Sequence, residues 1–144
     1  MAAEYIGIQE QTVESTQNIL LTDSIPCNKG YVVHRNGSGI FTLRGIVNGS
    51  CGCFARYQIT ANGNIAIATG GTVDPISIAI TLNGEALQSS RAIVTPAAVE
   101  EYDNVTVTAL ITVPRGCCST VAIENISGQA ILSQNMNVVI DRVA

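Results

Sequence analysis

Three segments of the chain alternate apolar and polar residues with a period of two. They are residues 40–47, 51–60 and 104–113. Successive side chains of a strand point to opposite faces, so this period predicts β-strands that bury one face. In residues 51–60, for example, Tyr57 and Ile59 fall on the apolar face, while polar residues occupy the other.

Glycine-containing pairs separate the apolar runs and predict tight turns, because Asn-Gly tolerates the positive φ values of short hairpins. The pairs are Asn36-Gly37, Asn48-Gly49, Asn62-Gly63, Asn83-Gly84, Arg115-Gly116 and Ser127-Gly128. Short strands joined by turns at this spacing predict an all-β protein, an antiparallel sandwich or barrel. Residues 95–102 are the one helix-like stretch, and we expect at most one or two helical turns there.

Charge is scarce and unevenly distributed. The chain is 47% hydrophobic and only 12% charged, against about 25% in soluble domains. Residues 1–28 hold four acids and no base, which accounts for the whole net charge of −4, and residues 29–144 are neutral. This division predicts an acidic N-terminal arm over residues 1–28 and a globular domain over residues 29–144. The arm either meets a basic partner surface or is a solvated terminus.

The same distribution argues against several classes of protein. The bases are scattered singly, so we expect no nucleic-acid partner, which would require clustered Lys and Arg. No stretch offers the ~18 consecutive apolar residues of a membrane helix, so no membrane partner is expected. The first residues lack a basic and then apolar leader, so we expect synthesis in the cytoplasm without a secretory signal.

Catalytic chemistry is sparse. His34 is the only histidine, and no Gly-x-Ser-x-Gly motif is present. His34 is expected at the surface, at a strand end. Glu100, Glu101 and Asp103 cluster in a predicted loop without a nearby base. We therefore expect no enzymatic activity and no cofactor.

The cysteines are the most reactive groups in the chain. They are Cys27, Cys51, Cys53, Cys117 and Cys118. Without a secretory signal, buried reduced thiols are the first expectation. A disulfide linking Cys51 or Cys53 to Cys117 or Cys118, within or between subunits, is an alternative. A zinc site drawing on Cys51, Cys53 and Cys117 is another, although the usual Cys-x₂-Cys spacing is missing.

The order of several motifs resembles the tumour-necrosis-factor (TNF)/complement-head jelly-roll family. The runs are residues 54–60, 78–84, 105–108 and the closing 137–144. The likeness extends to the C-terminal domains of collagen-like spore-surface glycoproteins of Firmicutes. It also extends to small virion proteins of Firmicutes phages, through the Val-Pro-x-Gly-Cys-Cys segment at 113–118.

This resemblance implies an antiparallel two-sheet jelly-roll sandwich (TNF-like) that forms a homotrimer and carries an extended N-terminal arm. Such trimers pack one sheet's outer face around the three-fold axis, which agrees with a body that carries few charges. Four residues are expected near that axis, with core packing as the alternative: Tyr57, Ile59, Met136 and Val138.

The function implied is a structural virion protein that decorates the capsid exterior as a trimer, with the major capsid protein as its partner. The residues expected to attach the arm to the capsid are Glu10, Val13, Glu14, Ile19, Leu20 and Leu21. The alternative is a receptor- or glycan-binding tip of a fibre or spore-surface protein that binds host surface glycans. Sugar binding in jelly-roll loops typically uses exposed aromatic rings, for which only Tyr102 and Tyr31 qualify.

Overall fold

The computed structural model of the protein describes residues 2–25, 30–47 and 52–143. These residues form twelve strands and one short 3₁₀ helix, η1. The elements are β1 (Ala2–Gly7), β2 (Gln11–Val13), β3 (Asp23–Ile25), β4 (Val32–His34), β5 (Ile40–Arg44), β6 (Phe54–Ile67), β7 (Ile76–Leu82), β8 (Glu85–Ala86), η1 (Gln88–Ser90), β9 (Ala92–Val94), β10 (Asp103–Pro114), β11 (Cys118–Asn125) and β12 (Ile131–Arg142).

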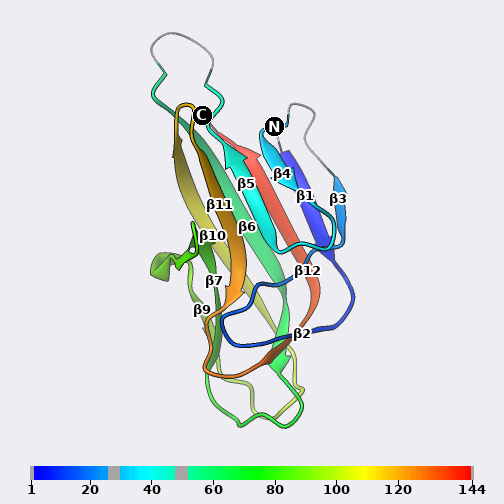
Figure 1. Cartoon of the computed structure of the whole chain (residues 1–144). Coiled ribbons are helices and arrows are strands. Elements are labelled where there is room, and N and C mark those ends of the chain that lie inside the picture. Colours follow the sequence, from blue (N-terminus) through cyan, green and yellow to red (C-terminus); the bar gives the residue numbers. More distant parts are fainter. Residues whose placement is uncertain (1, 26–29, 48–51, 144) are drawn as a thin grey trace.

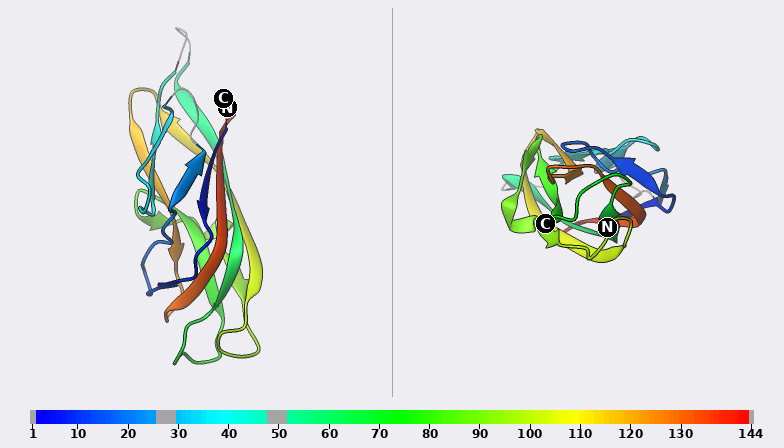
Figure 2. Two further views of the ribbon diagram at one scale, coloured as in Figure 1. Left: turned by 90° about the vertical axis from the view of Figure 1, so that its right-hand side faces the viewer. Right: turned by 90° about the horizontal axis from the view of Figure 1, so that it is seen from below.

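The described strands make two six-stranded antiparallel sheets that pack face to face (Figure 1). Sheet A has the order β10-β6-β12-β1-β3, and β2 also pairs with β12. Sheet B has the order β4-β5-β11-β7-β8, and β9 also pairs with β7. Figure 2 shows the sandwich from the side and from one end, with the chain termini close together. The predicted antiparallel sandwich is confirmed.

The alternating pattern sets the two faces of each long strand. Along β6 the side chains alternate between buried and accessible, and Tyr57 and Ile59 are fully buried. In the β10–β6 register Ile111 lies opposite Tyr57 and Leu110 opposite Gln58. The apolar residues of both strands therefore share the inner face, and their polar neighbours share the outer face.

Most of the predicted turns are found. Asn83 and Gly84 have φ values of 52° and 87° between β7 and β8, and Gly116 (φ 77°) lies in the β10–β11 turn. The Asn62-Gly63 prediction was wrong, because both residues lie inside β6. A Cβ on Gly63 would come within 2.7 Å of Met136 Cε, so this glycine admits a neighbouring strand rather than a turn.

Two further predictions concern the helix-like stretch at residues 95–102 and the Asn48-Gly49 turn. Residues 95–102 contain no helix, and the one helix among the described residues is η1, which ends five residues before Thr95. Asn48-Gly49 lies outside the described residues.

The N-terminal segment is part of the sandwich, which corrects the expectation of an extended arm separate from residues 29–144. Strand β1 pairs with β12 over six residues and with β3 on its other side. Ala3 and Tyr5 are buried in the core, and Ile19 N donates a 2.8 Å hydrogen bond to the Ile123 carbonyl. Glu4, one of the four acids that suggested an arm, occupies an outward position of a strand whose alternate residues point inward.

A β-bulge interrupts the β12–β6 ladder between Gln134 and Asn137. Asn135, within the bulge, has a φ of 55°, and its N–H donates to the Ile8 carbonyl at 3.2 Å. On one side of the bulge β12 pairs with β1, and on the other it pairs with β2. The bulge therefore lets a single strand hold both parts of the N-terminal segment.

Candidate assembly surface

The four residues expected at a three-fold axis lie inside the sandwich. All four side chains are fully buried in the single chain: Tyr57, Ile59, Met136 and Val138. The Tyr57 hydroxyl donates to the Arg44 carbonyl at 2.6 Å and reaches the Tyr31 carbonyl at 3.3 Å, so it ties the two sheets together. Because an interface residue must be accessible in the single chain, these positions are corrected from interface to core.

The accessible side of the same strands is the outer face of β6 and β10. We call it the β6/β10 outer face, and it comprises Phe54, Arg56, Gln58, Thr60, Asn62 and Asn64 of β6 with Asn104, Thr106, Thr108, Leu110 and Thr112 of β10. Arg56 is its one charged residue, and the Arg56 guanidinium lies 4.7 Å over the Phe54 ring. The rest of the face is neutral.

The polar side chains of this face bond largely to one another. Asn104 Nδ2 donates to Asn62 Oδ1 at 3.0 Å and to Asn64 Oδ1 at 3.2 Å. The hydroxyls of Thr60 and Thr108 lie 3.4 Å apart. Polar groups that already have partners lose less on being covered than unpaired groups do, so a neighbouring chain can cover this face without a large desolvation cost.

The edge of the face is more apolar. Leu110 is 58% exposed, and it lines a groove of about 520 Å³ together with Ser89 of η1 and Ala109. Strand β10 is an edge strand of sheet A. An exposed leucine in a groove beside a long edge strand is a typical protein contact surface.

Of the six residues expected to attach to a capsid, three are buried and three are exposed. Val13, Ile19 and Leu21 are buried in the core, so they cannot contact a partner, and this part of the prediction is corrected. The other three, Glu10, Glu14 and Leu20, are exposed.

We call Ile8, Glu10, Glu14 and Leu20 the 8–20 strip. Ile8 is 58% and Leu20 47% exposed. Leu20 lines a small, mainly apolar pocket of about 130 Å³ next to Gln11, whose side chain bonds both the N–H and the carbonyl of Leu20 at 2.9 Å. A small apolar pocket and two exposed carboxylates are therefore accessible on this segment.

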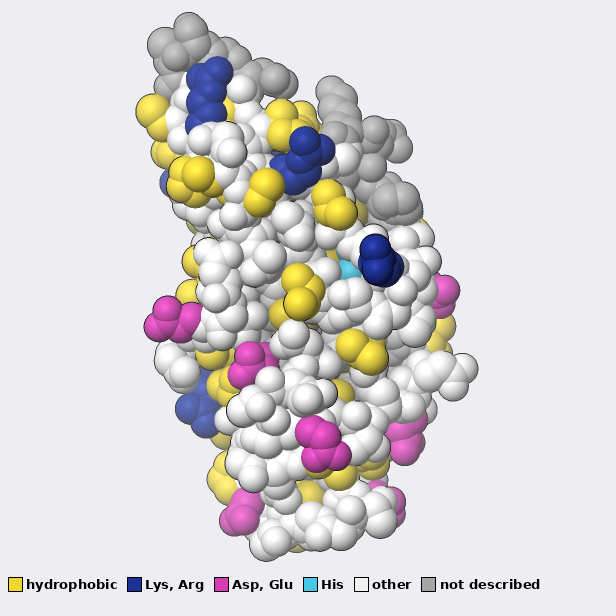
Figure 3. Space-filling model, viewed as in Figure 1, with side chains coloured by type: hydrophobic (Ala, Val, Ile, Leu, Met, Phe, Trp, Pro, Cys, Tyr) yellow, Lys and Arg dark blue, Asp and Glu magenta, His cyan; other side chains and the backbone are white. Residues whose placement is uncertain are grey.

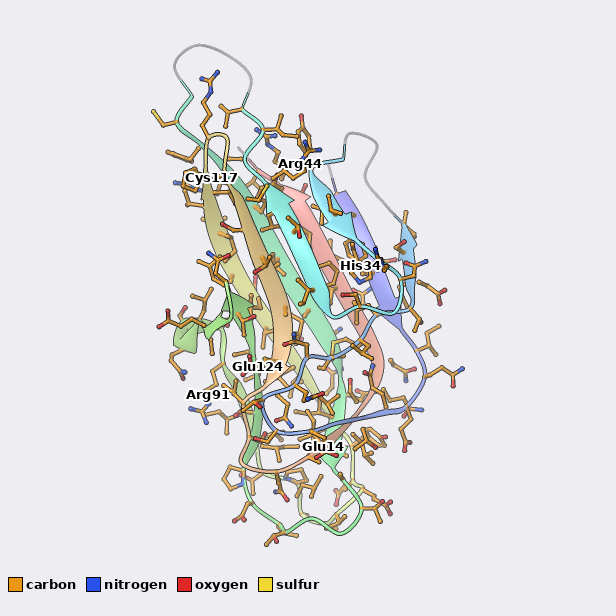
Figure 4. All side chains as sticks on the ribbon, in the orientation of Figure 1. Glu14, His34, Arg44, Arg91, Cys117 and Glu124 are labelled. Carbon is orange, nitrogen blue, oxygen red and sulfur yellow. The ribbon has the colours of Figure 1, made fainter. Side chains whose placement is uncertain are left out.

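Charge is polarised along the molecule on the face shown in Figure 3. Arg side chains, including Arg44, lie toward the end that carries the chain termini, whereas Asp and Glu side chains gather in the other half. Glu14 and Glu124 are in the acidic half, and Arg91 is the exception there (Figure 4). Burial raises the pKa of Glu124.

The cysteines that the structure describes are exposed, which differs from the expectation of buried thiols. Cys53, Cys117 and Cys118 are all accessible, and Cys117 lies near the end of the sandwich that carries the termini (Figure 4). Cys27 and Cys51 lie outside the described residues, and with Cys51 so does the zinc-site prediction. Within the described ranges no three His, Cys, Asp or Glu side chains are grouped to hold a metal ion.

The single histidine has a packing role. The His34 ring stacks on Phe41 at 4.5 Å and meets Tyr5 edge-on at 4.8 Å, and its Nε2 lies 2.8 Å from the Ser38 carbonyl. It lies at the end of β4, as predicted, and it is half-buried rather than fully exposed.

The two aromatic rings that qualified for stacking on sugars, Tyr31 and Tyr102, are covered at least in part. Tyr31 is 9% exposed, and the Arg142 guanidinium covers its ring at 4.3 Å. Tyr102 packs against the buried cluster of Ala66 and Leu132. Burial, together with the side chain of Glu10 and the charge of Glu100, raises the pKa of Tyr102 to about 12. The described structure therefore adds no exposed aromatic ring in support of the glycan-binding alternative at Tyr31 or Tyr102.

No protein-family model and no curated protein matches the chain. Among solved structures, murine APRIL aligns with a TM-score of 0.67 and 9% identity, covering 99% of this chain and 98% of APRIL. The globular domain of the zebrafish complement 1qA protein aligns with a TM-score of 0.55 and 10% identity, covering 99% and 94%. Vertex protein P5 of PRD1 has a TM-score of 0.48 and 14% identity, covering 99% and 96%.

The first two structures define the fold as a TNF/C1q-like jelly-roll sandwich, which confirms the predicted fold class. Both alignments cover nearly the whole chain, so the N-terminal strands belong to the shared fold as well. In the described ranges, no helix is long and apolar enough to cross a membrane.

Proposed function

We propose that the chain is a non-catalytic structural protein of a phage virion, which assembles as a homotrimer and decorates the capsid exterior. The observation that carries the proposal is the β6/β10 outer face, a long and almost uncharged surface with exposed Leu110 at its edge. A neighbouring chain can cover such a face without burying unpaired charges, and depletion of charge is typical of the core of protein interfaces.

A closed ring of copies suits this surface. In a cyclic trimer the contact is heterologous, so a patch on one subunit meets a different patch on the next. The groove beside Leu110 lies at one edge of sheet A, and β3, with Ile25 60% exposed, lies at the opposite edge. One sheet therefore offers an apolar groove and a projecting apolar side chain on its two sides.

The virion role is supported by the resemblance of residues 113–118 to a segment of small phage virion proteins. The 8–20 strip provides the attachment surface for the major capsid protein in this proposal, in place of a free arm. Glu10 and Glu14 are exposed on the same segment as the apolar pocket at Leu20, and opposite charges on a partner surface would set the orientation of that partner. Synthesis in the host cytoplasm followed by binding to the finished shell completes the proposal.

Sedimentation with shells of a phage that encodes the chain, purified without the protein, tests this function. A Glu10→Lys/Glu14→Lys variant should lose binding, because both carboxylates of the strip are reversed. A Glu85→Lys/Glu101→Lys variant makes the same change of charge at two other exposed acids and should bind as the unmodified protein does. Equal binding by both variants contradicts the role of the strip, and no binding by the unmodified protein contradicts the decoration proposal.

A further inference from the structure

A second surface feature lies where the connection between β6 and β7 meets the connection between β11 and β12. This end of the sandwich is opposite the chain termini, at the bottom of Figure 1. A pocket of about 230 Å³ opens there, lined by Thr72, Asp74, Pro75, Gly128 and Gln129. It is separate from the β6/β10 outer face and shares no residue with the 8–20 strip.

The pocket is built before any ligand arrives. Gln129 Oε1 accepts a 3.0 Å hydrogen bond from Thr72 N, and Gln129 Nε2 donates to the Thr72 carbonyl at 2.8 Å. A Cβ on Gly71 would lie 2.7 Å from Gln129 Oε1, so glycine leaves room for this side chain. The two connections are thus clamped, and a clamped site loses less entropy when it binds.

The lining combines acceptors with a small apolar surface. Asp74 is exposed, and its carboxylate has no hydrogen bond or ion pair with the residues that the structure describes. Pro75 presents the apolar ring of its side chain, and Gly128 has no atom within 4 Å of an added Cβ, so the entrance beside it is open. A carboxylate accepts hydrogen bonds only, and up to four of them.

This lining excludes some ligands and favours another. None of the five residues is basic, so phosphate and other anions have no partner. One carboxylate falls short of the six to eight oxygens that Ca²⁺ takes. A sugar ring has adjacent hydroxyl donors on its rim and apolar C–H groups on its faces, which match a carboxylate next to a proline ring.

The geometry points to this pocket as a binding site for one neutral sugar ring, with Asp74 accepting hydrogen bonds from two adjacent hydroxyls and Pro75 contacting a face of the ring. The volume of about 230 Å³ is below the ~300–1,000 Å³ of pockets for larger ligands, so one ring fits rather than a long oligosaccharide. The inference does not depend on trimer formation or capsid attachment.

Amide NMR spectra of the isotope-labelled full chain, titrated with methyl glycosides of glucose, galactose, N-acetylglucosamine and rhamnose, test the site. At least one glycoside should cause saturable shifts at Thr72, Asp74, Gly128 and Gln129, with a Kd of about 1 mM or weaker, as suits a small exposed site. Asp74→Asn should weaken that binding about tenfold, because charge-assisted hydrogen bonds are roughly twice as strong as neutral ones.

Glu85→Gln removes a charge elsewhere and is the matched control, with unchanged affinity expected. Gln129→Ala opens the clamp and should weaken binding while the remaining spectrum stays that of the folded protein. Three results would overturn the inference: no saturable shift with any glycoside, shifts confined to other residues, or equal affinity in the Asp74→Asn variant. Saturable shifts of the same amides with CaCl₂ and not with any glycoside would overturn it as well. All of these are read whether the chain is a monomer or a trimer, so they leave the assembly proposal untouched.

Discussion

The two faces of β6 are formed by alternate residues of the same strand, yet they differ in burial and in polarity. The inner face carries Ala55, Tyr57 and Ile59 at 0% exposure, and it packs against sheet B. The outer face carries Gln58, Thr60 and other neutral polar residues that remain accessible. The inner face therefore stabilises the single chain, and the outer face remains accessible for the proposed contacts between chains.

This difference teaches that an apolar residue on a strand is a poor guide to an interface in a sandwich. The most apolar alternate positions are used by the fold itself, and the proposed assembly surface is made from what remains. A face of Thr, Asn and Gln with paired amides is better suited to reversible covering than a face of exposed Ile and Tyr, which would aggregate.

The largest expected effect is on assembly. Leu110→Arg places a charge at the edge of the β6/β10 outer face, and burying it without a partner costs several kcal/mol in each subunit contact. Size-exclusion chromatography with light scattering should show monomers at micromolar concentration. Ile93→Arg is the matched control, since Ile93 is 60% exposed against 58% for Leu110 but lies on β9 of sheet B. If both variants keep the mass of the unmodified protein, the outer face of sheet A is not the interface.

The next effect is on the stability of the chain. Ile59→Ala empties a fully buried position of the inner face and should lower the free energy of unfolding by about 2–5 kcal/mol. Thr60→Ala, one residue away on the outer face, should change it by less than about 0.5 kcal/mol. Urea denaturation followed by circular dichroism measures both. Equal losses would show that the two faces do not differ as described.

Gly63→Ala should have an intermediate effect, because it adds a Cβ on the inner face 3.0 Å from Met136 Cα and Sδ. Overpacking of this kind costs about 1–3 kcal/mol. Gly128→Ala has no atom within 4 Å of its added Cβ and should be nearly neutral. Thermal denaturation of the two variants, measured in parallel, compares their stabilities. A Gly63→Ala variant as stable as Gly128→Ala would contradict the close packing of Gly63 against Met136.

The smallest effect is expected at Ser133, a polar residue of the inner face. It is fully buried, and its hydroxyl has no hydrogen-bond partner among the described residues. Ser133→Ala should therefore leave stability unchanged or raise it slightly. Ser127 is the comparison, because its hydroxyl oxygen accepts from Ser77 N at 2.8 Å and donates to the Ser77 carbonyl at 3.1 Å. Ser127→Ala should cost about 1–3 kcal/mol, and a larger loss at Ser133 would contradict this account.

The sequence predicted the parts of the fold that depend on neighbouring residues. Alternation in residues 51–60 and 104–113 places the side chains of β6 and β10 on the correct faces, and the Asn83-Gly84 turn follows from local backbone preferences. Asn62-Gly63 carries the same local signal but lies in a strand, because the packing of Gly63 against Met136 is a contact between distant parts of the chain.

The N-terminal strands were missed for a similar reason. A sum of charges over residues 1–28 hides the fact that Glu4 faces outward while Ala3 and Tyr5 face the core. The alternation within 2–7 was available, but only pairing with β12 at the far end of the chain gives it a partner. The sugar pocket likewise joins residues 72–75 to residues 128–129, and no local motif marks it.

The central claim is that the outer face of sheet A holds three copies together, and the solution mass of the unmodified chain tests it most directly. Multi-angle light scattering at micromolar concentration should give three times the chain mass of 15.1 kDa, with the same value across a tenfold dilution. A mass of 15.1 kDa throughout the dilution series would contradict the account.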